Sequence, residues 1–572
     1  MNASDFADKL IASRPAVISK GPAAGRNLEA EGGCGVIGIA CSEPLSGRHL
    51  LQALDQMKNR GNGKGGGIAA VGLEAAHFGV TQAVLDEDYL LALAYLEPDC
   101  RPDVEHNHLR PTFEIDHVHQ VAHMDDYRAL PGLEVQPPEV VIYFGHVRPE
   151  VRQRFAAENG LADAPARLLD DEIVYQNTQR LNQEFYSAAG RTRAFVLSHG
   201  RNLLVLKMVG FGDGVIRYYQ LEGLRAHIWI GHHRYPTKGR VWHPGGAHPF
   251  VGLNEALVHN GDFANYASIC EYLGQRNIQQ LFLTDTEVSV QVFDLLYRSY
   301  GYPLEYVVEA LAPTTERDYA MLPAEKRHVY GLLQTTHMHS SPDGPWFFLI
   351  AQSDQADGRP AYRLTGITDT SMLRPQVFAW QASGRDGPAI GFAASEKQAI
   401  DAALNSLASE DGRFWSRADR YWNARGGSHT DGGAFVFTVS PQPEGGARLE
   451  CRDKFGRPVR PEAEQVPYRA NGSRPAPLRL PAGGPAELAA WLAGQIPNCD
   501  YASVLEFLAG LEAQAATDEG WRRALETLTW LMDRRYPTGR LRRSSLLSLY
   551  DGAFDWLIEC LVARPPGELV YD

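Results

Sequence analysis

The chain has 572 residues and a formal net charge of −14, with 44% hydrophobic and 10% aromatic residues. This apolar content is enough to bury a large core, which excludes disorder throughout the chain. The acidic balance repels phosphate groups, so we expect no nucleic-acid partner. At about 150 residues per domain, the length predicts three or four domains.

Export and membrane signals are missing from the sequence. No apolar run approaches the roughly 18 residues of a membrane span, and residues 1–33 contain no long apolar block. The cysteines form no Cys-x-x-Cys pair, which argues against a disulfide scaffold or an iron–sulfur site. We therefore expect a cytoplasmic protein with no membrane partner. The cysteines are Cys34, Cys41, Cys100, Cys270, Cys451, Cys499 and Cys560.

The first elements follow a leader at residues 1–33, which is rich in Ala, Gly and polar residues and is expected to be mobile. The apolar run 34–41 predicts a buried strand. Leucines at helical spacing then predict a helix after residue 50, which Arg60-Gly61 ends. A second strand is expected over 65–72.

The middle of the chain mixes strand and helix signals. Residues 75–190 are rich in His and acidic residues and are interpreted as an insertion in the core fold. Residues 193–208 predict a hairpin, and an apolar alternation predicts further strands near 226–231, 256–259 and 434–439. Helices are expected at about 265–275, 285–300 and 396–408. This mixture indicates an α+β class with layered sheets and helices.

The C-terminal part changes composition. Nine prolines fall within 441–485, which predicts a linker or an extended segment. Leucine and tryptophan recur at helical spacing over 486–563, so we expect 486–572 to form a small helical domain.

Several short motifs each have an ordinary structural interpretation. A cysteine inside Cys34-Gly-Val-Ile is usually a small buried hydrophobic residue. Asn260-Gly261 is a common hairpin turn, and Thr284-Asp-Thr-Glu287 is a common helix start. Their joint occurrence with Gly231-His-His-Arg-Tyr-Pro-Thr237 and Ala247-His-Pro-Phe250, in this order, is much less expected by chance.

Together with Arg60-Gly-Asn-Gly-Lys-Gly-Gly-Gly-Ile68, these motifs resemble the class II glutamine amidotransferases. Their glutaminase domain is an N-terminal-nucleophile hydrolase with an αββα sandwich. Within the class, the chain is most similar to the glutaminase part of glutamate-synthase-type enzymes. The resemblance covers about 34–440 and implies hydrolysis of the glutamine γ-amide through a cysteine thioester.

The resemblance also implies a role for each matching residue. Cys34 is the expected nucleophile, with its own α-amine as base once residues 1–33 are removed. Asn260 and Gly261 are expected to stabilise the oxyanion. Arg234 is expected to bind the α-carboxylate of glutamine, and Asp285 its α-ammonium group. Three further residues are expected around the substrate, His259 mainly as a support for the Asn260-Gly261 turn: Thr237, Arg60 and His259.

No cofactor is expected, because the chain lacks a phosphate-binding loop and a flavin-sized domain. Histidines and acidic residues between His106 and Asp126 could bind zinc, but a polar loop is the simpler interpretation and no metal is expected. The resemblance implies glutamine as substrate and a separate synthase subunit that accepts the ammonia. The alternatives are a stand-alone hydrolase of another small amide and a catalytically silent assembly scaffold.

Overall fold

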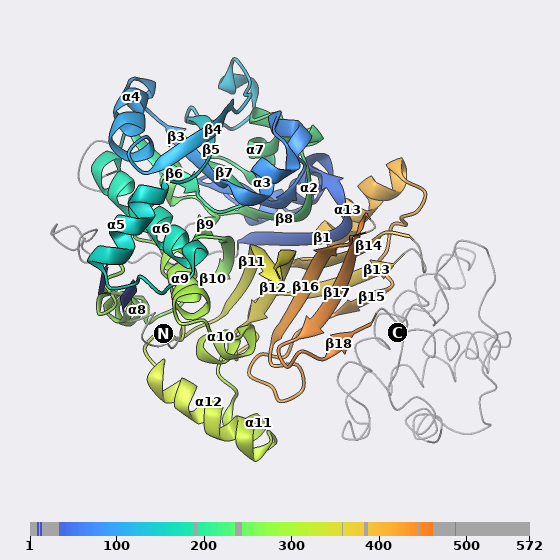
Figure 1. The fold of residues 1–572 in the computed structure, drawn as a ribbon. Helices are drawn as coiled ribbons and strands as arrows, with labels where there is room; N and C mark the ends of the chain where they lie inside the picture. Colours follow the sequence, from blue (N-terminus) through green and yellow to red (C-terminus); the bar gives the residue numbers. More distant parts are fainter. Residues whose placement is uncertain are drawn as a thin grey trace, which may run out of the picture. The chain divides into compact units, whose positions relative to one another are not determined.

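The fold is a mixed α/β arrangement of antiparallel sheets, seen here in a computed structural model (Figure 1). This agrees with the predicted α+β class. The structure describes residues 9–10, 12–13, 34–186, 192–234, 243–356, 358–382, 387–443, 445–460 and 487. Thr237, most of the leader and the predicted C-terminal helical domain therefore lie outside the described residues.

The first sheet has seven strands, and β1 lies at its centre between β14 and β8. Both neighbours are far from β1 in the sequence: β8 by about 190 residues and β14 by about 360. In spatial order the strands are β15 (Arg420–Trp422), β13 (Val377–Ala382), β14 (Ala389–Ala394), β1 (Gly35–Ser46), β8 (Arg225–His233), β2 (Gly66–Leu73) and β7 (Leu203–Met208).

The second sheet also has seven antiparallel strands, and a third, smaller sheet has four antiparallel strands. The second sheet runs β18 (Pro458–Val459), β17 (Ala447–Asp453), β16 (Ala434–Pro441), β12 (Arg359–Thr368), β11 (Trp346–Ala356), β10 (Glu255–Gly261) and β9 (Phe250–Val251). The four-stranded sheet runs β4 (Phe113–Gln120), β5 (Glu139–Val147), β3 (Tyr89–Tyr95) and β6 (Ala194–Ser198).

Three apolar clusters explain how these layers pack. Between the two large sheets lie alternate side chains of both, such as Val36, Ile230, Val258 and Leu349. The other face of the first sheet is covered by α2 (Gly47–Gln56), α7 (Gly212–Tyr218) and α13 (Lys397–Glu410). The other face of the second sheet is covered by α8 (Tyr266–Gly274), α9 (Asp285–Asp294) and α10 (Leu304–Leu311). Side-chain alternation along each strand produces this layering, because successive residues point to opposite faces.

The insertion at 75–190 contains β3, β4 and β5 of the four-stranded sheet, together with four helices (upper part of Figure 1). Three of its strands were not predicted, because short apolar runs among polar loops carry little periodic signal. Its helices are α3 (Gln82–Glu87), α4 (Arg101–Val104), α5 (Pro149–Glu158) and α6 (Ala166–Phe185). Two more helices, α11 (Glu316–Ala320) and α12 (Ala324–Thr336), follow α10.

The hairpin predicted at 193–208 is wrong. β6 pairs with β3 in the four-stranded sheet, whereas β7 pairs with β2 in the first large sheet. The intervening turn therefore joins two sheets, and the apolar alternation alone could not distinguish this from a hairpin.

Two further segments differ from their sequence-based description. The segment expected to be a linker contributes β17 and β18, which extend the second sheet beyond β16. In the leader, Leu10 is buried against Ala156, Leu161 and Leu169 of the insertion. Lys9 donates a hydrogen bond of 2.9 Å to the carbonyl of Gly160. These leader residues are therefore packed rather than detached.

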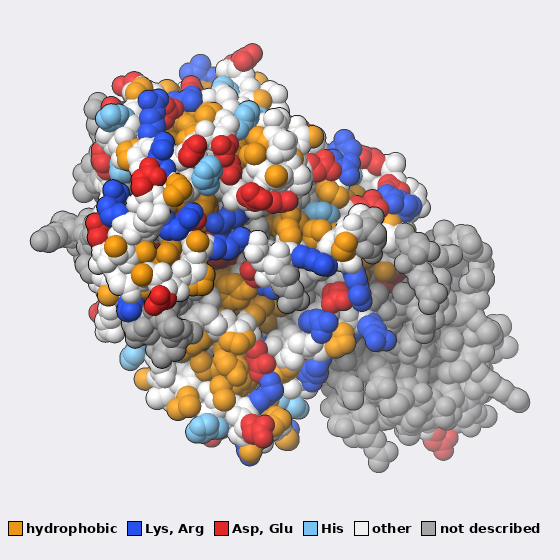
Figure 2. Space-filling view, viewed as in Figure 1, with side chains coloured by type: hydrophobic (Ala, Val, Ile, Leu, Met, Phe, Trp, Pro, Cys, Tyr) orange, Lys and Arg blue, Asp and Glu red, His pale blue; other side chains and the backbone are white. Residues whose placement is uncertain are grey.

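Among the helices that the structure describes, none combines the length and the apolar character needed to cross a membrane. On the face shown in Figure 2, acidic and basic side chains are intermingled rather than gathered in one large basic patch.

Candidate active site

Three of the sequence motifs meet at one end of the two large sheets. Gly35 pairs with His233 across β1 and β8, so Cys34 and Arg234 follow at the same edge. Arg234 also donates its backbone N–H to the carbonyl of Gly65, at 2.9 Å. The start of β1, the end of β8 and the glycine-rich segment before β2 therefore lie side by side.

Side-chain parity directs these residues into the space between the sheets. Val36 and Ile230 lie in the cluster between the sheets, and Cys34 and Arg234 are two and four residues away from them on the same strands. Val258 of β10 lies in the same cluster, so Asn260 shares its face. Because β10 packs against β1 and β8, the same layer holds all three motifs.

Asn260 and Gly261 do not form a hairpin turn. Both lie within β10, opposite Phe347 and Trp346 of β11. Gly261 has a φ of 142°, and a Cβ at this position would lie 2.2 Å from the carbonyl oxygen of Pro345. Only glycine fits this close approach of two backbones. The side-chain oxygen of Asn260 is buried and accepts no hydrogen bond from the residues that the structure describes.

Arg234 and Asp285 form the charged part of the site. Arg234 is buried, and its Nη1 donates a hydrogen bond to the carbonyl of Gly246. Burial lowers the pKa of Arg234, whereas Asp285 and Cys34, both within electrostatic range, favour its charged form. The site therefore holds a guanidinium near the expected nucleophile.

Asp285 begins α9, where the positive end of the helix dipole favours a carboxylate. Burial acts to raise the pKa of Asp285, but His259, Arg234 and the N–H of Thr286 outweigh burial and hold that pKa below its usual value. His259 Nδ1 lies 3.7 Å from Asp285 Oδ2. Asp285 Oδ2 nevertheless accepts no hydrogen bond from the described part of the chain.

Histidines from two motifs support the site without carrying charge. The rings of His232 and His248 stack with centroids 4.1 Å apart, and His248 Nε2 lies 2.8 Å from Thr286 Oγ1. Burial lowers the pKa of both His232 and His248 well below the usual value, so both rings are neutral near pH 7. These rings join β8, the loop before β9 and the start of α9.

The side chain of Arg60 points away from the residues gathered around Cys34. Its guanidinium forms an ion pair with Glu396 at the start of α13. Its Cβ lies beneath Gly35, on the face of β1 opposite to that of Cys34. The structure therefore gathers Cys34, Arg234, His259, Asn260, Gly261 and Asp285 in one region, and places the charged end of Arg60 against the helix layer.

A buried lysine behind the site was missed from the sequence. Lys207 Nζ donates to the carbonyls of Gly245 and Pro249, at 3.1 and 3.2 Å, and so holds the loop that carries His248. Burial lowers the pKa of Lys207 to about 7, and Glu287 opposes that shift. Glu287 accepts three backbone N–H groups from residues 281–283. The only sequence signal was a single lysine inside the apolar run 203–208.

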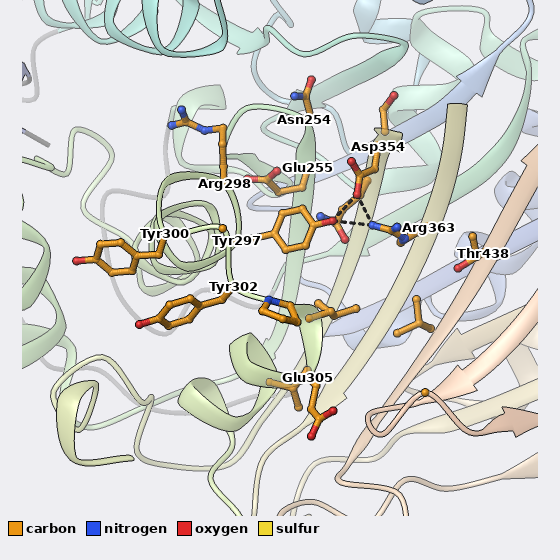
Figure 3. Close-up of a pocket in the computed structure, with 18 of the residues that line it drawn as sticks. Asn254, Glu255, Tyr297, Arg298, Tyr300, Tyr302, Glu305, Asp354, Arg363 and Thr438 are labelled. Atoms are coloured by element: carbon orange, nitrogen blue, oxygen red, sulfur yellow. Dashed lines mark hydrogen bonds and ion pairs between the residues drawn. The ribbon is translucent and has the colours of Figure 1, made fainter. Parts of the chain in front are cut away.

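A large cavity lies away from these motifs. It has a volume of about 1,210 Å³ and begins at Asn254 and Glu255, at the opposite end of β10 from Asn260 (Figure 3). Arg363 Nη1 donates to the hydroxyl of Tyr297 at 2.7 Å, and both contact Asp354. None of the residues predicted for the site lines this cavity.

Comparison with known proteins gives a family relationship. A protein of Archaeoglobus fulgidus, described only as uncharacterized, is 30% identical over 377 residues, which are 65% of this chain and 88% of the archaeal protein. The chain belongs to the same family as that archaeal protein. No established family profile matches the chain.

Proteins with named functions match this chain only locally. The glutamine–fructose-6-phosphate aminotransferase of Campylobacter jejuni is 30% identical over 131 residues, 23% of this chain and 21% of the enzyme. The Thermus thermophilus enzyme is 30% identical over 159 residues, 27% of this chain and 25% of the enzyme. The chain thus spans about a fifth to a quarter of these relatives, and this part is homologous to glutamine amidotransferases.

Among solved structures, the glutamine phosphoribosylpyrophosphate amidotransferase of Bacillus subtilis is 13% identical, with a TM-score of 0.31. That match covers 74% of this chain and 49% of the amidotransferase.

Proposed function

We propose that the chain is the glutaminase component of a class II glutamine amidotransferase, with the N-terminal-nucleophile hydrolase sandwich and with Cys34 as nucleophile. The observation that carries this proposal is the convergence of Cys34, Arg234, Asn260 and Asp285 from four distant motifs at one end of two facing sheets. The local homology to glutamine-dependent aminotransferases supports the same reaction.

The charges of the site complement a free α-amino acid. Glutamine carries one carboxylate and one ammonium group, and Arg234 and Asp285 provide one opposite charge for each. The planar guanidinium of Arg234 can bind a carboxylate through two parallel hydrogen bonds. The available oxygen of Asp285 can accept from the ammonium group. This matched pair favours glutamine over amides that lack an amino-acid end.

In the proposed reaction, Cys34 Sγ attacks the γ-carbonyl carbon of glutamine. The α-amine of Cys34 takes the thiol proton and then gives it to the leaving nitrogen, which departs as ammonia. The amide of Asn260 and the backbone N–H of Gly261 donate to the negative oxygen of the tetrahedral intermediate. Water then cleaves the thioester and releases glutamate, which restores the thiol.

This mechanism requires removal of residues 1–33, because an amide nitrogen at Cys34 is no base. We propose cleavage between Gly33 and Cys34. Intact-mass measurement of active protein tests this step, and a fully active chain that retains residues 1–33 would contradict it.

We further propose that the ammonia passes to a separate synthase subunit of a glutamate-synthase-like complex in the cytoplasm. In this proposal the described sheets and helices form the glutaminase and its insertion, and the partner provides the acceptor chemistry. Isolated protein should then release glutamate slowly, and a partner with its acceptor should accelerate the reaction. Glutamate formation from 2-oxoglutarate by the isolated chain would contradict a split enzyme.

The deciding experiment compares glutamate release from glutamine for the wild type, Cys34→Ala and Cys41→Ala. Cys41 is the matched control, because it lies on the same strand and burial raises the pKa of its thiol to about 12. We expect activity in the wild type and the Cys41 variant, and none in Cys34→Ala. Equal rates in all three proteins would leave the scaffold alternative, and activity only on other small amides would favour the stand-alone hydrolase.

A further inference from the structure

A second cluster of ionisable groups lies on the four-stranded sheet of the insertion. Asp88 immediately precedes β3, Asp116 lies in β4, and His146 lies in β5. The register pairs Tyr89 with Gly145 and Glu114 with His146. Three adjacent strands therefore bring these side chains into one row, although nearly 60 residues separate the first from the last.

A β-bulge adds Asp116 to this row. Ile115 pairs with Gly145 and His117 pairs with Phe144, so Asp116 is the extra residue that faces no partner across the ladder. A bulge redirects the side chain of the extra residue and often lies next to a functional site. Here it brings the Asp116 carboxylate to His146, whose Nδ1 lies 3.2 Å from Asp116 Oδ2.

The spacing of the three groups fits a single ion. His146 Nδ1 also lies 3.9 Å from Asp88 Oδ1, and one donor atom from each of the three residues lies within 4.8 Å of the others. Donors that are each about 2.1 Å from a zinc ion lie about 3.4 Å apart in a tetrahedron. A small side-chain adjustment is enough to reach that geometry.

The Asp88 carboxylate is buried beside a second carboxylate. Asp88 is only 4% exposed, and its Oδ2 is buried without a hydrogen-bond donor among the described residues. Within the described ranges no Lys or Arg forms an ion pair with Asp88, Asp116 or Glu114. A buried carboxylate beside a second carboxylate is costly unless a cation or a shared proton neutralises the pair.

The second nitrogen of His146 is also supported. His146 Nε2 lies 3.6 Å from Glu114 Oε2, which lies directly across the ladder. Histidines that bind metals commonly donate their other ring N–H to a carboxylate, which fixes the ring and its tautomer. The cluster therefore contains three donors and an orienting carboxylate.

We propose that Asp88, Asp116 and His146 bind one divalent transition-metal ion of the zinc or manganese type. An imidazole donor favours such ions over calcium and magnesium, which prefer oxygen ligands. The partly exposed side chains of Asp116 and His146 leave room for water to complete the coordination. The bound ion joins β3, β4 and β5, and this site is separate from the glutaminase residues.

Zinc titration of the full-length protein tests the proposal. The protein is first stripped with EDTA, the chelator is removed, and zinc binding is measured by competition with a chromophoric chelator. The variants are Asp116→Asn, His146→Ala and the milder Glu114→Gln, all at partly or largely exposed positions. The controls are Asp125→Asn and His106→Ala, two exposed residues of the same insertion.

We expect wild type and controls to bind one tight equivalent of zinc that Asp116→Asn and His146→Ala lose. Glu114→Gln should weaken this binding by about tenfold, as removal of an orienting partner does. Zinc should also raise the thermal midpoint of the wild type and not that of His146→Ala. Identical zinc affinity and stoichiometry in all proteins would overturn the proposal, and no tight zinc in the wild type would mean that Asp88 and Asp116 share only a proton. Neither result depends on glutaminase activity.

Discussion

The candidate active site and the Asp88–Asp116–His146 cluster are both polar, but their charges are balanced differently. At the active site, Asp285 lies near Arg234 and His259, and Glu287 lies near Lys207. In the cluster, two carboxylates face one imidazole, and a third carboxylate lies behind it. A balanced site complements a molecule with no net charge, such as a zwitterion, whereas an excess of carboxylates complements a cation. Charge balance therefore predicts a different kind of ligand for each region.

The largest expected effect is the loss of the nucleophile. Cys34→Ala should abolish glutamate release, because without the thiol no thioester forms, while zinc binding should remain unchanged. A coupled glutamate assay on purified, processed protein measures the loss. If Cys34→Ala retained more than one per cent of the wild-type rate, Cys34 would not be the nucleophile, and the region around it would not be the active site.

The next effect concerns the expected oxyanion donors. Asn260→Ala should lower kcat about 100- to 1,000-fold, the usual loss for one such donor, with a smaller change in KM. Gly261→Ala should be at least as harmful, because its Cβ would approach the carbonyl of Pro345. Steady-state kinetics separate kcat from KM. A change confined to KM would assign Asn260 to substrate binding instead.

A smaller effect should follow from weakening the grip on the amino acid. Arg234→Lys keeps the charge but loses the bidentate geometry, so KM should rise about 10- to 100-fold, equivalent to about 1.5–3 kcal/mol. Asp285→Asn should act on the ammonium end to a similar extent. Glutamine analogues that lack the α-amine provide the control, because they should be insensitive to Asp285→Asn. Equal sensitivity for analogue and glutamine would contradict this role.

Acid should weaken the contact between α6 of the insertion and the segment before β10. His199 contacts Thr178 of α6 at 2.7 Å and the carbonyl of Gly252 before β10, and burial lowers its pKa to about 4. Because the unfolded chain has the higher pKa, of about 6.5, it binds more protons between pH 6.5 and 4, so stability falls as pH falls through this window. From pH 6.5 to 5 the loss should be about 1–2 kcal/mol. Thermal midpoints at both pH values measure this loss, and His199→Gln should reduce the difference whereas His106→Gln should not.

The smallest effect is expected from metal removal. EDTA should lower the thermal midpoint by a few degrees, at about 2–4 °C for each kcal/mol in a domain of this size, and leave kcat unchanged. Differential scanning calorimetry together with the glutaminase assay provides both readouts. A matching fall in kcat would show that the two regions are functionally coupled.

The sequence was sufficient for features that depend on local patterns. Apolar alternation located β1, β8, β10 and β16, and helical spacing located α8, α9 and α13. The order of the short motifs identified residues that the fold gathers at one edge, although the roles of Cys34, Asn260 and Arg234 remain predictions. Thr237 lies outside the described residues.

Features that depend on long-range pairing could not be predicted. Nothing local in 193–208 shows that its two strands join different sheets. The histidines noted between His106 and Asp126 scatter in the fold: His108 contacts Glu184, and His123 stacks on Tyr218. Only Asp116 of that set joins the proposed metal site, because its partners come from residues 88 and 146, which the register alone brings together.

The central position of β1 affects how the protein matures. Ile37 pairs with Gly231 on one side and with Ala394 on the other, so both edges of this strand are covered only after nearly 400 residues have been synthesised. Pairings over such distances form late and slowly during folding. A nascent or truncated chain consequently has no assembled pocket around its cysteine. If the proposed glutaminase function holds, ammonia release would thereby be confined to finished molecules.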